Sequence, residues 1–86
     1  MEVYKIRIYP SARRDLQEIE DDLIVSEISS LSTMPLRFPH PRDLSLAAKG
    51  YRYLTVNNYL VFYIVSGDTV QIHRILYARR DYSRLL

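Results

Sequence analysis

The chain has no cysteine, no tryptophan, two glycines and two histidines among its 86 residues. The lack of cysteine excludes a disulfide scaffold, a thiolate metal site and a cysteine nucleophile. Two imidazoles, those of His40 and His73, are too few to form a zinc site by themselves. With only Gly50 and Gly67, the chain also has no glycine-rich phosphate loop. We therefore expect neither a metal ion nor a cofactor.

Long hydrophobic runs are also missing. No run approaches the ~20 residues that a membrane-spanning helix needs. The opening segment MEVYKIRIYP lacks the hydrophobic stretch of a signal peptide. These absences indicate a soluble, cytoplasmic protein with no membrane partner. The length predicts one domain, residues 1–86, with a modest core.

Charge is divided unevenly along the chain, although the net charge is only +2. Residues 1–32 hold four bases and seven acids, whereas residues 33–86 hold eight bases and three acids. Ten of the twelve bases are arginines, whose planar guanidinium suits phosphate and carboxylate groups. A basic half rich in Arg and Tyr fits an RNA-binding surface or an acidic protein partner, and it fits an ordinary solvated sheet edge equally well.

The N-terminal part predicts a strand followed by a helical segment. Residues 2–9 alternate as a half-buried strand does, Pro10 ends the strand, and Ser11 is a suitable helix N-cap. Residues 12–32 then carry two helical stripes of different phase. We therefore expect a distorted or broken helix, which either bends near residues 21–23 or divides there into two short helices.

The C-terminal part predicts an antiparallel meander. Three prolines make residues 33–50 an ordered loop that lies over the sheet. The β-rich segments that follow are separated by Asn-Asn and Ser-Gly-Asp turns, and they span residues 50–56, 59–65 and 69–77. The fold class is therefore α+β, a small antiparallel sheet of about four strands in β-α-β-β-β order, packed against a helical layer. About twenty helical residues cannot cover both faces, so one face should be open or covered by a partner.

Candidate functional residues come from the Arg, Tyr and His side chains of this sheet. Arg can stabilise charge that develops on a phosphate, and Tyr or His can exchange protons. Strict strand alternation groups Arg74 with Ile72 and Leu76, on the face opposite His73. A histidine in this setting is more often structural than catalytic. Tyr59 and Tyr63 share a face of the middle strand and are expected in the core.

The chain resembles the RelE/ParE superfamily of bacterial toxins. The residues that carry the resemblance span nearly the whole chain: ARRDLQEI (12–19) after the opening strand, MPLRFP (34–39), GYRYLTVNNYLVFYIV (50–65) and VQIHRILYARRDYSRLL (70–86). The family usually has two helices between the first strand and the proline-rich loop, and here only about twenty residues fill that space. The sequence leaves open whether this short form is natural, engineered or incomplete.

The resemblance implies the toxin of a type II toxin–antitoxin module, a class associated with plasmid stabilization and growth inhibition, neutralised by a cognate antitoxin and oligomeric through that complex. One branch of the superfamily cleaves mRNA at the ribosome, and the ParE-like branch inhibits DNA gyrase. Arg52 and Arg80 match basic residues of the nuclease branch, whereas Leu60 stands where that branch has Arg and Tyr77 stands where some members have His.

The resemblance therefore favours a ParE-like action on gyrase. The alternatives are a RelE-like, ribosome-dependent and metal-independent mRNA endonuclease, or a degenerate module that only binds its partner. If the chain is an enzyme, the catalytic residues implied are Arg52, Arg74, Tyr77 and Arg80. The binding residues implied are Arg79, Asp81, Tyr82 and Leu60.

Overall fold

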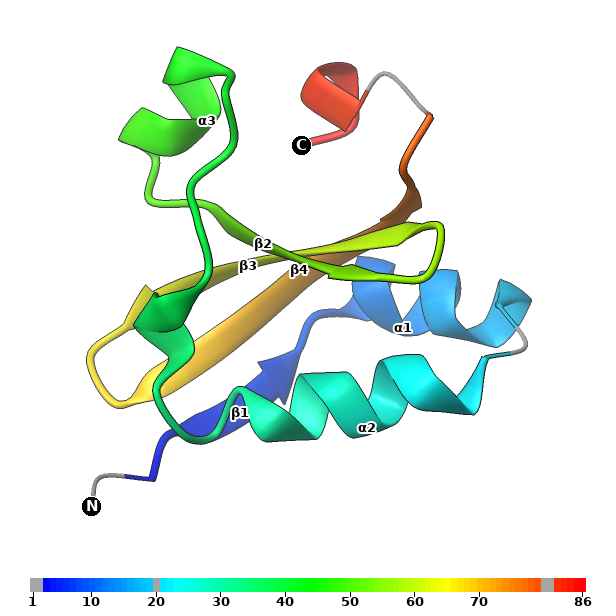
Figure 1. The fold of residues 1–86 in the computed structure, drawn as a ribbon, viewed down its shortest axis with the longest axis horizontal. Helices are drawn as coiled ribbons and strands as arrows, with labels where there is room; N and C mark the ends of the chain where they lie inside the picture. The colour runs from blue at the N-terminus through cyan, green and yellow to red at the C-terminus, as the bar shows by residue number, and fades with distance from the viewer. Residues whose placement is uncertain (1–2, 20, 80–81) are drawn as a thin grey trace.

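The computed structural model describes residues 3–19, 21–79 and 82–86. These described residues form four strands, three α-helices and two short 3-10 helices (Figure 1). In chain order these are β1 (Lys5–Ile8), α1 (Pro10–Glu18), α2 (Asp22–Ser30), η1 (Pro35–Arg37), α3 (Leu44–Ala48), β2 (Arg52–Val56), β3 (Tyr59–Ser66), β4 (Thr69–Tyr77) and η2 (Tyr82–Arg84). The α+β class and the predicted order of strands and helices are confirmed.

The four strands form one sheet in the order β1-β4-β3-β2. The antiparallel meander β2-β3-β4 is as predicted, and its tight turns place Asn57 and Gly67 at positive φ of 53° and 59°. One detail of the prediction is wrong, because β1 pairs with β4 in parallel. The helices and the long loop return the chain to the opposite edge, so β1 and β2 become the two edge strands.

The predicted break in the helical segment is confirmed as two separate helices. The backbone is extended at Ile19 and Asp21, and the Asp21 side chain accepts a hydrogen bond from the backbone N–H of Leu23 to begin α2. Ser11 is not the cap of α1, contrary to expectation. Tyr9 occupies that position, and the Ser11 hydroxyl instead donates to the carbonyl of His73 on β4.

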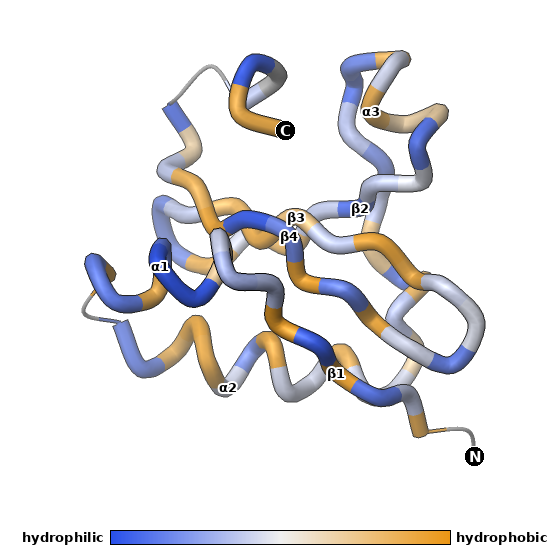
Figure 2. The backbone as a smooth tube through the Cα atoms, turned by 180° about the vertical axis from the view of Figure 1, so that it is seen from behind, coloured by the Kyte–Doolittle hydropathy of each residue, from blue (hydrophilic) through white to orange (hydrophobic). Residues whose placement is uncertain are grey.

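Hydrophobic clusters cover both faces of the sheet, on either side of the uniformly hydrophobic β3. Helices α1 and α2 lie on one side, and α3 and the C-terminal end lie on the other (Figures 1 and 2). Val61 and Tyr63 belong to the cluster under α1 and α2, and Phe62 belongs to the cluster under α3. The predicted open face is therefore partly covered by the chain itself.

Helix α3 was missed in the sequence, where residues 33–50 read as a loop. Asp43 caps this short helix, accepting from the backbone N–H groups of Ser45 and Leu46. Burial of Leu46 against the sheet attaches the helix to the second face. A single buried residue is too weak a periodic signal to predict five helical residues.

A bulge in β4 overturns the predicted alternation. Phe62 pairs with Arg74 and Tyr63 pairs with Ile72, which leaves His73 as the additional residue. Ile72 therefore lies in the cluster under α1 and α2, whereas Leu76 lies in the other cluster, so Arg74 does not share a face with both. The bulge occurs where the pairing of β1 with β4 ends. From there on α1 contacts the edge of β4, and the Ser11 hydroxyl donates a hydrogen bond to the carbonyl of His73.

Candidate functional site

A groove on the second face of the sheet is the candidate functional site. We call it the sheet groove, and its volume is about 400 Å³. It is lined by Arg42, Tyr53, Thr55, Leu60, Phe62, Ala78 and Tyr82. These residues come from the segment before α3, from β2 and β3, and from the C-terminal end. The groove is therefore built by parts of the chain that are far apart in sequence.

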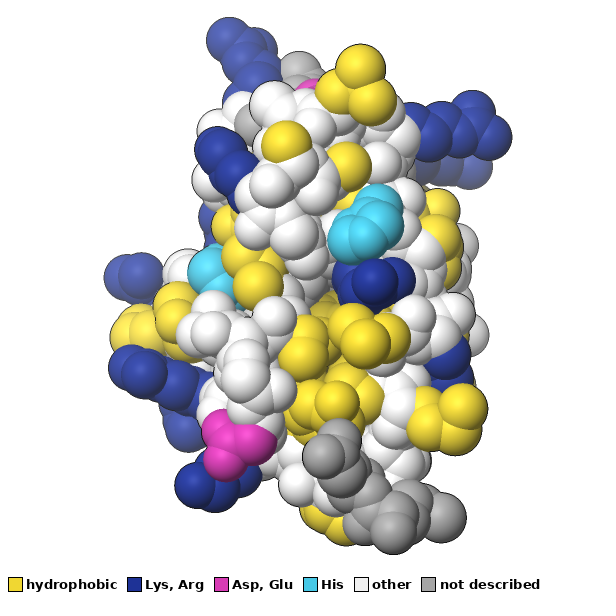
Figure 3. All heavy atoms as spheres, turned by 90° about the vertical axis from the view of Figure 1, so that its left-hand side faces the viewer, with side chains coloured by type: hydrophobic (Ala, Val, Ile, Leu, Met, Phe, Trp, Pro, Cys, Tyr) yellow, Lys and Arg dark blue, Asp and Glu magenta, His cyan; other side chains and the backbone are white. Residues whose placement is uncertain are grey.

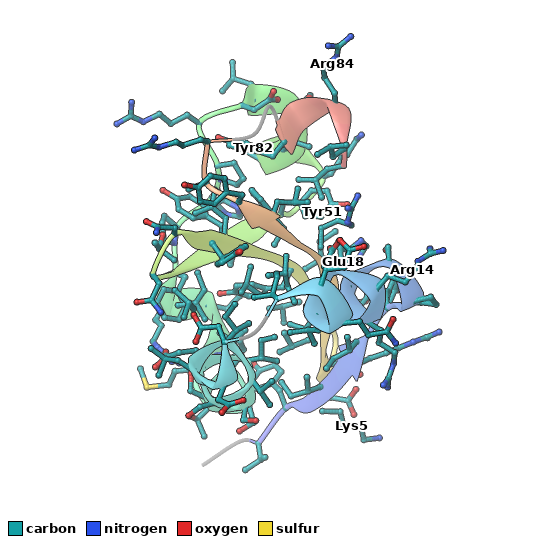
Figure 4. All side chains as sticks on the ribbon, turned by 90° about the vertical axis from the view of Figure 1, so that its right-hand side faces the viewer. Lys5, Arg14, Glu18, Tyr51, Tyr82 and Arg84 are labelled. Carbon is teal, nitrogen blue, oxygen red and sulfur yellow. The ribbon has the colours of Figure 1, made fainter. Side chains whose placement is uncertain are left out.

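The floor of the sheet groove is hydrophobic and aromatic. The register of β2 and β3 places Tyr53 beside Phe62 and Thr55 beside Leu60. Tyr82, the first residue of η2, packs on Phe62 with ring centroids 4.9 Å apart, and Figure 4 shows it on the side of η2 that faces the sheet. Arg42 is exposed and supplies the groove with a cation. Such a lining suits a hydrophobic segment that also carries carboxylates.

Of the sequence-predicted site residues that the structure describes, Leu60 and Tyr82 line this groove. Arg79 is exposed just beyond β4. Arg80 and Asp81 lie outside the described residues, so their predicted roles stay predictions. Arg42 and Tyr53, which also line the groove, were missed in the sequence.

Arg52 lies on the other face of the sheet and binds the proline-rich loop. Its guanidinium donates to the carbonyls of Leu36 and Phe38, at 3.2 and 2.7 Å. Tyr77 also lies on that other face, packed against Tyr59 with centroids 5.8 Å apart. The pairing separates the two by four residues of β3, roughly 13 Å along the strands. Arg52 and Tyr77 therefore do not converge on one point.

Arg74 is held in an ion pair with α1. Its Nε and Nη2 atoms donate to the two carboxylate oxygens of Asp15, at 2.8 and 3.0 Å, and this bonding raises the pKa of Arg74. One of the same oxygens accepts the backbone N–H of Ile75, at 2.9 Å. Asp15 thus pairs with the charge of Arg74 and also satisfies a backbone N–H at the edge of β4. Arg74 therefore has a structural role in this arrangement.

A second polar cluster surrounds His73. The ring of His73 stacks on Tyr9 with centroids 4.5 Å apart. Its Nδ1 lies 3.2 Å from the Tyr51 hydroxyl and its Nε2 lies 3.3 Å from Oε1 of Gln71. Every one of these bonds is satisfied when His73 is neutral, with Tyr51 donating to Nδ1 and Nε2–H donating to Gln71. Tyr51, His73 and Gln71 therefore form one hydrogen-bonded cluster beside the bulge.

Burial of His73 makes stability depend on pH. Desolvation lowers the pKa of His73 below its usual 6.5, so the unfolded chain binds a proton more readily than the folded protein does. We therefore expect the free energy of unfolding to fall as the pH is lowered from 7.5 to 5.5. Above pH 7.5 His73 is neutral in both states, so it adds no pH dependence there. Thermal melts of the wild type and of His73→Gln at both pH values test this.

His73→Gln should show a smaller drop in melting temperature than the wild type. The pKa values of Asp43 and Asp68 are also shifted, but they lie below 3.8 because of hydrogen bonds from Ser45 and Thr69, so both carboxylates remain ionised throughout this range. An identical drop in both proteins would assign the pH dependence to other groups.

Neither a metal site nor a membrane-spanning helix is formed by the described residues. Residues 3–19, 21–79 and 82–86 contain no group of three or more His, Asp or Glu side chains placed to hold a metal ion. No helix in the described part of the chain is long and apolar enough to cross a membrane.

Comparison with known proteins identifies the family. The model of the family described as the ParE toxin of the type II toxin–antitoxin system parDE matches residues 6–82. The fold resembles a solved structure of the chromosomal ParDE system of P. aeruginosa, with a TM-score of 0.72 and 20% identity over 92% of this chain and 100% of that chain. It also resembles the toxin–antitoxin complex RelBE2 of Mycobacterium tuberculosis, with a TM-score of 0.69 and 27% identity over 90% of this chain and 93% of that chain.

No curated protein matches the chain. The family match nevertheless extends from β1 to η2 and includes both clusters and the sheet groove. The chain belongs to the ParE toxin family of type II toxin–antitoxin systems.

Proposed function

We propose that this toxin inhibits DNA gyrase by binding it, without catalysis, and that an antitoxin segment neutralises it by occupying the sheet groove. The observation that carries the proposal is the hydrophobic floor formed by Leu60 and Phe62, in a groove that receives neither Arg52 nor Arg74. The toxin would then act in the cytoplasm, where gyrase and DNA are found, and would inhibit growth there.

Chemistry supports binding over cleavage. Metal-independent RNA cleavage needs a proton acceptor, a proton donor and a cation within hydrogen-bond reach of one phosphodiester. Arg52 is bonded to loop carbonyls and Arg74 is paired with Asp15. Tyr77 lies on the face of the sheet that α1 and α2 cover. Among the described residues, these three nuclease candidates are therefore directed to different places.

A RelE-like nuclease remains the second candidate, because the fold also resembles a RelBE2 complex and because His73 and Tyr51 form a hydrogen-bonded pair able to exchange a proton. Induction of the toxin in bacteria separates the two. We expect loss of negative supercoiling in a reporter plasmid and no ribosome-phased mRNA cuts by primer extension. Phased cuts with normal supercoiling would instead support the nuclease, and neither effect would support a module that only binds its partner.

Arg80 is the residue expected to matter most for toxicity, from its match to the family's C-terminal arginine. We expect Arg80→Ala to remain folded, with a melting temperature within about 3 °C of the wild type. It should still bind antitoxin but lose most growth inhibition, measured by colony counts after induction. Arg84→Ala, a change of an exposed arginine in η2, is the matched control. Full toxicity of a folded Arg80→Ala protein would move the site elsewhere.

A further inference from the structure

The turn formed by residues 34–36 presents two hydrophobic side chains to solvent. Met34 is 71% exposed and Leu36 is 55% exposed, while Pro35 between them is buried. The turn lies between α2 and α3, away from the residues that line the sheet groove (Figure 1). Figure 3 shows hydrophobic side chains reaching the surface beside Lys and Arg on the side of the molecule that Figure 1 has at its left.

The backbone of this turn is fixed by side chains from three directions. Arg37 donates to the carbonyls of Thr33 and Met34, and the buried Tyr63 hydroxyl donates to that of Pro35. Arg52 donates to the carbonyl of Leu36. Four successive carbonyls are therefore occupied, so Met34 and Leu36 project from a rigid support.

Met34 also has an unfavourable backbone conformation. Its φ and ψ are 49° and 52°, in the left-handed region where Gly and Asn are usual and a long side chain is uncommon. Asn at this position would relieve the strain and would also remove a hydrophobic side chain from water. A strained, exposed methionine on a rigid support is the arrangement expected of a binding element.

We propose that Met34 and Leu36 form an anchor that inserts into a hydrophobic pocket of a folded protein with an acidic rim. The projection is convex and rigid, so it requires a partner with a concave surface, whereas the concave sheet groove suits an extended segment. The guanidinium groups of Arg37 and Arg52 both bond to carbonyls of this turn, and residues 33–41 contain no acid, which makes carboxylates the complementary rim. This inference rests on the proposed function, under which that folded partner is gyrase.

Binding of purified gyrase to the immobilised toxin tests the anchor. The double variant Met34→Asn/Leu36→Ser should bind gyrase roughly tenfold more weakly or worse, as expected for the loss of central interface residues. Its melting temperature should equal or exceed that of the wild type, because the substitution relieves strain. The matched control is Leu44→Ser, which removes a leucine that is 84% exposed on α3, and it should bind within about twofold of the wild type.

Each outcome of the binding experiment leads to a different conclusion. Equal binding by the wild type and a folded double variant overturns the anchor and leaves the proposed function intact. Failure of the wild type to bind gyrase overturns gyrase as the partner and with it the proposed function. Loss of antitoxin binding in place of gyrase binding assigns the turn to the antitoxin, against the proposal. If the double variant unfolds, the single variant Leu36→Ser, which keeps Met34, gives the same comparison.

Discussion

Replacing Asp15 by alanine is expected to lower the free energy of unfolding by about 3 kcal/mol. The carboxylate binds the Arg74 guanidinium and the backbone N–H of Ile75, and the two side chains of the pair are only 13% and 22% exposed. Its removal leaves a mostly buried cation and a strand N–H without their partner. For a domain of this size the melting temperature should fall by about 15 °C, measured by circular dichroism.

Glu18→Ala is the matched control, because Glu18 lies one turn further along α1 and is exposed. Replacement by Ala improves helix propensity at both positions, and more so for Asp15, so the difference between the variants is a lower bound on the lost contacts. Asp15→Asn should fall between Asp15→Ala and the wild type, since its side-chain oxygen can still accept one bond. Equal melting temperatures for Asp15→Ala and Glu18→Ala would show that the contacts to β4 add nothing.

Substitution of Leu60 by glutamate is expected to weaken antitoxin binding by about 100-fold or more. The new carboxylate would lie on the hydrophobic floor of the sheet groove, beside Phe62 and Tyr82, where cover by a bound segment would remove it from water. It would also repel an acidic segment. Surface plasmon resonance with the cognate antitoxin measures the loss. Val25→Glu, which places the same charge on an exposed residue of α2, should bind like the wild type.

Arg42→Glu tests the charge of the same groove without disturbing its floor. Arg42 is exposed, so the variant should fold normally. We expect a lower association rate and a weaker dependence of that rate on salt, because opposite charges accelerate encounter and salt screens them. Association of the wild type that is unchanged between low and physiological ionic strength would contradict the electrostatic part of this account.

The meander could be predicted because its signals are local. Asn57 and Gly67 adopt the positive φ that their turns require, and the hydrophobic run of β3 indicates cover on both faces. The parallel pairing of β1 and the bulge at His73 could not be predicted in this way. Both depend on α1 and β1 meeting β4, contacts between segments about sixty residues apart that leave no periodic pattern.

The candidate site, too, could be predicted from the sequence only in part. Leu60 and Tyr82 were predicted from the resemblance and lie in the sheet groove. Arg52 and Arg74 matched the residue types of a nuclease, but their guanidinium groups are bound to loop carbonyls and to Asp15. Residue type alone does not reveal whether an arginine is already paired within the fold.

Supercoiling of relaxed plasmid by purified gyrase, titrated with this toxin, tests whether the toxin acts on gyrase by binding. We expect supercoiling to be inhibited in proportion to toxin concentration, with purified ribosomes and mRNA left uncut in a parallel reaction. Addition of the cognate antitoxin should restore supercoiling. Normal supercoiling at saturating toxin, together with cleavage of ribosome-bound mRNA, would contradict the claim that the toxin acts on gyrase by binding.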